Sequence, residues 1–142
     1  MAFRAFATIV ALLLSACSAT ISLPVAQLTP TPPERVTWKD SIATDAGTLL
    51  IARDAGLHGS AARVFVAVDG IAAGDVRVEE VLKLQVDPGR KVVSMSVYAG
   101  LGGEMRRPRS LEVTVSPGRI TLLRIGFDEM AGGVSLWQEV SP

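Results

Sequence analysis

The chain has very little cysteine and histidine, two residues that often build catalytic and metal sites. It has one cysteine and one histidine in 142 residues. A single cysteine excludes an intramolecular disulfide, so the folded region must be stable through packing alone. A single histidine leaves no second imidazole to share a zinc ion. We therefore expect no metal site and no cofactor.

The net charge is zero, and aromatic residues are few. Fourteen basic and fourteen acidic residues cancel, and they are interspersed rather than gathered in blocks. Without a net electrostatic field we expect no nucleic-acid partner. Aromatic residues make up 5% of the chain but apolar residues 49%, so the predicted core is aliphatic. The length allows one domain.

The clearest apolar run lies at the N-terminus. Arg4 and the amino terminus supply positive charge, and residues 5–14 form an apolar stretch of the length typical of an export signal. Pro24 and the Ser/Thr-rich SACSATIS interrupt this run before the roughly 20 apolar residues that a membrane span requires. We predict a signal peptide; an uncleaved membrane helix is the alternative.

The cysteine follows this run directly. Leu14-Ser15-Ala16-Cys17 resembles the bacterial lipobox, which implies a lipoprotein signal peptide of residues 1–16 and an acylated Cys17. The resemblance places the protein on the cell envelope, and Ser18 favours the periplasmic face of the outer membrane over the inner membrane. Cleavage after Ala19, which would release a soluble periplasmic protein, is the alternative.

Residues 17–35 are predicted to be an acylated N-terminus and a proline-rich tether. Four prolines without a clear period are typical of an extended spacer. At about 3.1 Å per residue, such a spacer would reach ~50 Å from the leaflet and hold the domain clear of lipid. An alternative is that a segment of it, residues 23–28, packs as an edge strand.

Beyond residue 35 the apolar residues alternate with a period of two, which predicts strands. One face of three predicted strands carries Val64, Val66 and Val68, then Leu82, Leu84 and Val86, then Val93, Met95 and Val97. Further strands are predicted at 48–53, 111–115, 120–127 and 134–140. Seven or eight short strands and no helix predict an all-β fold, a small antiparallel β-sandwich over residues 36–142.

Turn residues separate these strands. Asp69-Gly70 predicts a two-residue hairpin. Pro88-Gly89 and Pro117-Gly118 stand in a repeated context, DPGR and SPGR. We predict type II turns there, between antiparallel neighbours and at equivalent corners of the sandwich.

The order VAVDG, VDPGR and SPGR, followed by an aliphatic strand, resembles small immunoglobulin-like β-sandwich domains of the PEGA type. It is also similar to an uncharacterised family of bacterial lipoproteins, in which an arginine like Arg53 precedes a Gly/Ser-rich loop like residues 56–60. The resemblance implies a fold and an envelope location. It implies no activity.

Few residues suggest chemistry. His58, with Ser60 and Asp54 nearby in the sequence, would suit a small envelope hydrolase, but there is no G-x-S-x-G nucleophile motif. Three arginines near one loop are candidates for contact with an anionic surface or an acidic partner, namely Arg106, Arg107 and Arg109.

From these features we expect a membrane-anchored envelope lipoprotein and not an enzyme. Its β-sandwich would act as a structural or protein-interaction module. The expected partners are the membrane, through the N-terminal lipid, and an unidentified envelope protein or anionic surface. The alternatives are a hydrolase using His58 and Ser60, and a carrier of an apolar ligand.

Overall fold

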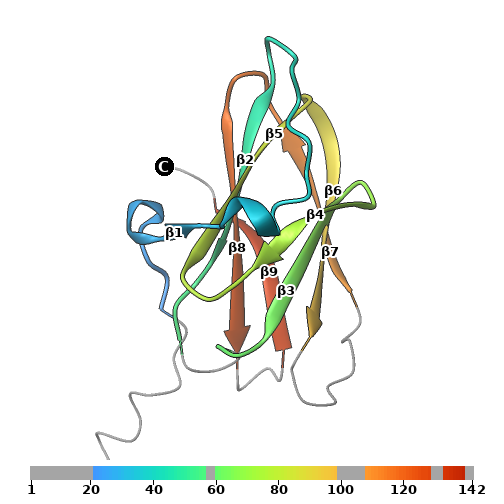
Figure 1. The fold of residues 1–142 in the computed structure, drawn as a ribbon. Coiled ribbons are helices and arrows are strands. Elements are labelled where there is room, and N and C mark those ends of the chain that lie inside the picture. Colours follow the sequence, from blue (N-terminus) through green and yellow to red (C-terminus); the bar gives the residue numbers. More distant parts are fainter. Residues whose placement is uncertain (1–20, 57–59, 99–107, 129–132, 140–142) are drawn as a thin grey trace, which may run out of the picture.

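The computed structural model describes residues 21–56, 60–98, 108–128 and 133–139. These ranges form a pair of sheets that pack face to face (Figure 1). The five-stranded sheet has the order β1, β5, β2, β8, β9, with bounds Thr29–Pro30, Glu80–Val86, Gly47–Arg53, Ile120–Asp128 and Gly133–Glu139. The four-stranded sheet has the order β4, β3, β6, β7, with bounds Ile71–Val76, Arg63–Val68, Gly89–Tyr98 and Arg109–Val115.

The alternating residues of both sheets meet in one aliphatic core. Every residue that the period of two placed on an inner face is buried: Val64, Val66, Val68, Leu82, Leu84, Val86, Val93, Met95 and Val97. Leu49, Ile51, Leu123 and Ile125 from the two central strands of the larger sheet complete this core. The predicted all-β sandwich is therefore confirmed, and burial of these side chains is its main source of stability.

Two strand pairs are parallel, while the others are antiparallel. β2 pairs with β8 in parallel, from Thr48 opposite Ile120 to Arg53 opposite Ile125, and the short β1 runs parallel to β5. Parallel neighbours cannot be joined by a tight turn. Between β2 and β8 the chain forms β3 and β4 in the smaller sheet, returns to the larger sheet as β5, and crosses again to form β6 and β7, which ties the two layers together.

The predicted turns are only partially right. Asp69-Gly70 joins the antiparallel strands β3 and β4 as expected. At the second Pro-Gly pair, Arg119 N donates to Ser116 O over 3.1 Å and Gly118 has a φ of 62°, as a type II turn requires. The prediction of antiparallel neighbours was wrong for both Pro-Gly pairs. β5 to β6 and β7 to β8 each cross from one sheet to the other, so these turns are corners of the sandwich.

Residues 21–38, which we call the strap, lie against the sandwich, although the sequence predicted a spacer there. The strap contains two short 3-10 turns, Val25–Gln27 (η1) and Pro33–Arg35 (η2), on either side of β1. Its first half covers the outer face of the larger sheet. There Leu28 is buried in a second apolar cluster with Ala52 and Val81, flanked by Leu23, Val25, Leu50 and Leu122.

The second half of the strap covers the edge of the smaller sheet. Thr37 N and Trp38 N both donate to Ala73 O on β4, over 3.0 and 3.2 Å. A side chain on Gly74 would stand 3.0 Å from Arg35 O, so glycine allows this close approach. The strap thus protects the free edge of β4 from pairing with another chain.

Candidate functional site

An arginine and a carboxylate form a buried ion pair beneath the first half of the strap. Arg124 on β8 donates from Nη1 to Asp54 Oδ1 over 2.8 Å and to Leu23 O over 2.9 Å. Ser22 Oγ donates to the other carboxylate oxygen of Asp54 over 2.9 Å. Arg124 also pairs with Glu139 on β9. We call this set the Arg124 cluster; it connects the strap to both β8 and β9.

Hydrogen bonds within the Arg124 cluster favour the charged form of Arg124. Burial alone would lower the pKa of Arg124, but its hydrogen bonds to Glu139 and Asp54 outweigh burial, so the pKa lies above the ordinary value. The Asp54 side chain has no exposed surface, and both of its oxygens accept hydrogen bonds from within the cluster. The cluster therefore joins the strap to β8 and β9, and both carboxylate oxygens of Asp54 are already hydrogen-bonded.

A second arginine, Arg53, is buried within the sandwich itself. It is 1% exposed and donates from Nη1 to Ala62 O and Val76 O over 2.7 and 3.1 Å. Its guanidinium also lies over the Phe127 ring, 4.7 Å from the centroid. Burial lowers the pKa of Arg53 to about 10. This side chain acts structurally, because it satisfies one carbonyl just before β3 and another at the end of β4.

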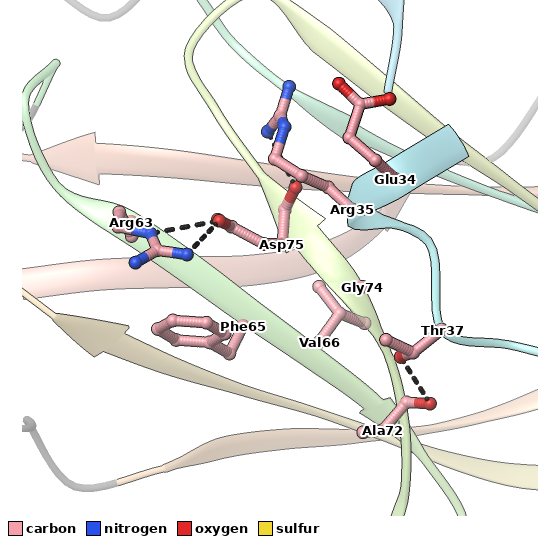
Figure 2. Close-up of a pocket in the computed structure, with 9 residues that line it drawn as sticks. All are labelled: Glu34, Arg35, Thr37, Arg63, Phe65, Val66, Ala72, Gly74 and Asp75. Carbon is pink, nitrogen blue, oxygen red and sulfur yellow. Dashed lines mark hydrogen bonds and ion pairs between the residues drawn. The ribbon is translucent and has the colours of Figure 1, made fainter. Parts of the chain in front are cut away.

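A cleft of about 270 Å³ opens between the strap and the outer face of β3 and β4 (Figure 2). It is lined by Glu34, Arg35 and Thr37 from the strap, by Arg63, Phe65 and Val66 from β3, and by Ala72, Gly74 and Asp75 from β4. Neighbouring strands place Phe65 and Asp75 directly opposite each other. The cleft therefore has an aromatic ring and a carboxylate side by side, with an arginine on either side.

Hydrogen bonds fix the charged residues of the cleft. Arg63 donates from Nε and Nη2 to Asp75 Oδ2 over 3.0 and 2.6 Å, and its guanidinium lies 4.9 Å from the centre of the Phe65 ring. Arg35 donates to the backbone oxygen of Asp75 over 2.9 Å and pairs with Glu80. The hydrogen bond to Glu80 is the main reason that the pKa of Arg35 is raised.

One buried hydrogen-bond acceptor in the cleft has no donor among the described residues. Asp75 is 5% exposed, and its Oδ1 accepts no hydrogen bond from any residue in the described ranges of the chain. A buried acceptor without a donor costs roughly 1–3 kcal/mol. Because this oxygen is itself buried, a partner's N–H or O–H group would recover that free energy only if the surrounding side chains of the cleft moved to expose it. The cleft thus combines a buried acceptor that lacks a donor with a half-exposed aromatic ring.

Several residues singled out from the sequence lie outside the described residues. These are Cys17, His58, Arg106 and Arg107. Arg109 is described: it is the first residue of β7 and is exposed. Ser60 lies in an exposed turn. Asp54, which a hydrolase would need, is held in the Arg124 cluster, so the hydrolase interpretation gains no support from the structure.

Sequence reasoning missed Arg53, Arg124 and Asp75 as buried charges. The signal for the two arginines was their place in apolar runs, at the end of TLLIAR for Arg53 and inside ITLLRIGF for Arg124. Charged residues are almost never fully buried unless they are paired, so an arginine in such a run indicates a partner. It does not say which one.

Comparisons with protein-family models, with curated proteins and with solved structures give no match. In the described ranges no three His, Cys, Asp or Glu side chains are grouped so that they could hold a metal ion. Nor does any helix in these ranges have the length and apolar character needed to cross a membrane. The candidate site therefore rests on the geometry of the cleft alone.

Proposed function

We propose that this protein is a bacterial envelope lipoprotein that is anchored through an acylated Cys17 and is not an enzyme. Its sandwich, of the immunoglobulin-like or PEGA-like kind, presents the cleft as a contact site for another envelope protein. The proposed location is the periplasmic face of the outer membrane. The lipobox-like residues 14–17 support the anchor, and the cleft supports the interaction.

The proposed interaction is supported by a difference between the Arg124 cluster and the cleft. In the Arg124 cluster both oxygens of the carboxylate are hydrogen-bonded. In the cleft, Asp75 Oδ1 has no donor among the described residues, and Phe65 beside it remains 36% exposed. Exposed aromatic residues and arginines are enriched at protein–protein interfaces, and the cleft holds both kinds.

The chemistry of the cleft favours a polypeptide segment that carries a hydrogen-bond donor. Once the surrounding side chains move to expose Asp75 Oδ1, a lysine, arginine or serine side chain or a backbone N–H would donate to it, while apolar atoms would cover Phe65. Arg35 and Arg63 are already engaged by Glu80 and Asp75, so they do not leave a strong net positive charge for an anion. A polypeptide partner thus fits better here than a phosphate group.

The anchor is tested by Cys17→Ser. Without the thiol no thioether to lipid can form, and signal cleavage at a lipobox depends on that step. We expect the variant to remain an unprocessed precursor that carries no lipid, as read by intact-mass spectrometry and by membrane fractionation. Ser18→Ala is the matched control and should mature as wild type. Normal maturation of Cys17→Ser would overturn the anchor.

The contact site is tested by photocrosslinking in intact cells. A photoreactive residue at Thr37, which lines the cleft, should give a discrete crosslinked product. The same residue at exposed Thr114 on β7 should give none. Asp75→Asn, which keeps the side-chain shape, should reduce the Thr37 product. Equal products at both positions, or no effect of Asp75→Asn, would contradict a contact at the cleft.

A further inference from the structure

The length of free chain between the lipid and the sandwich is set by where the strap begins. Ile21 is already fixed to the domain, because Ile21 N donates to Ala55 O over 2.8 Å and Ala55 N donates to Ile21 O over 3.0 Å. Only four peptide units separate Cys17 from Ile21. Even a fully extended chain spans at most about 14 Å over that length.

This contact lies at one end of the sandwich. Ala55 follows the end of β2, and Arg63 begins β3 at the same end. Tyr98 at the end of β6 pairs with Arg63. The Pro117-Gly118 corner lies at the opposite end, since Thr48 at the start of β2 donates its N–H to Arg119 O. Figure 1 shows the described chain entering at the end where β2 and β8 finish.

We infer that the sandwich sits directly on the lipid surface, with the end that carries Ile21, Ala55 and Arg63 facing the phospholipid headgroups. The inference rests on the acyl anchor in the proposed function and deepens it by naming the lipid surface as a second partner. Ile21 is 57% exposed, and its side chain lies at this end, next to the interfacial layer. The domain is not held ~50 Å from the leaflet as a free spacer would hold it.

Two physical consequences follow from so short a connection. The domain cannot rotate freely, because a linker of about four residues holds one end against the leaflet. Strands of 7 to 10 residues at about 3.3 Å per residue make the sandwich roughly 23–33 Å long. The opposite end therefore lies tens of ångströms from the headgroups, while the cleft begins at the near end with Arg63 and extends from there along β3 and β4.

The test uses single-cysteine labels, because the chain has one cysteine and acylation removes its thiol. Ser60→Cys is at the near end and Ser116→Cys at the far end; both positions are exposed. Each full-length acylated protein is labelled with a fluorophore and reconstituted in phospholipid vesicles that carry headgroup acceptors. We expect energy transfer from position 60 to be several-fold stronger than from position 116.

A matched variant tests whether the short connection causes the difference in energy transfer. An insertion of about ten Gly/Ser residues before Ile21 lengthens only the free connection, and should bring the energy transfer at the two positions close to equal. Equal or reversed transfer without the insertion would overturn the inference while leaving the anchor intact. A protein whose intact mass shows no lipid, and which does not bind the vesicles, would overturn the anchor and this inference together.

Discussion

Arg124→Met is expected to lower the free energy of unfolding by about 3–5 kcal/mol, the usual loss when one member of a buried ion pair is removed. Methionine fills much of the arginine volume but cannot donate to Asp54 or to Leu23 O. The carboxylate of Asp54 has no exposed surface, so it would keep only the hydrogen bond from Ser22. Urea unfolding of the acylated protein in detergent measures the change.

Two controls separate the buried charge from other effects of this change. Arg90→Met removes an arginine from the Arg90–Glu112 pair, whose side chains are 76% and 55% exposed, and should cost no more than about 1 kcal/mol. The double variant Arg124→Met/Asp54→Asn removes both charges and should recover much of the loss. A loss at Arg124 no greater than that at Arg90 would show that the Arg124 cluster does not stabilise the fold.

The core of the sandwich could be predicted because its signal is local. A period of two in a strand fixes which side chains face inward without any knowledge of the neighbouring strand. β4 lacked that signal. Its sequence IAAGDV holds a glycine and an aspartate, and its register shifts between Val66 and Ala67 of β3. It becomes a strand because the Asp69-Gly70 hairpin returns the chain alongside β3.

The strap and the candidate site could not be predicted, because their contacts are distant in the sequence. Arg124 and Asp54 are 70 residues apart, and Arg35 and Glu80 are 45 apart. The apolar residues of the strap lie between prolines and follow no period of 2 or 3.6, so a spacer was the natural prediction. What fixes them is the second apolar cluster around Leu28 on the outer face of the larger sheet.

Deletion of residues 29–33 distinguishes a strap that packs on the sandwich from a free spacer, because the two arrangements predict opposite results. The deleted residues connect the cluster around Leu28 on the larger sheet to the contacts of Arg35 and Thr37 on β4. Without them one half of the strap must detach. We expect the first half to leave, since the second half places Val36 and Trp38 against the main core.

Release of the first half should cost at least about 2.5–6 kcal/mol, from Leu28 and two backbone hydrogen bonds alone. Exposure of Leu28 accounts for roughly 1.5–3 kcal/mol. The hydrogen bonds from Thr29 N to Glu79 O and from Thr31 N to Val81 O add about 0.5–1.5 kcal/mol each. Pro32→Ala keeps the length of the strap and its backbone donors, and serves as the control. Urea unfolding of both variants gives the difference.

The same deletion should lengthen the free connection to the lipid, although it shortens the chain. Once Ile21 and Leu28 detach, the first fixed residue becomes Arg35, and about a dozen residues then separate it from Cys17 instead of four peptide units. A connection of that length can extend to roughly 40 Å. Energy transfer from a label at Ser60 to the headgroups should therefore fall. In a spacer that does not contact the sandwich, removal of five residues would bring the domain closer to the leaflet, raise the transfer and leave stability unchanged; that result would contradict the strap.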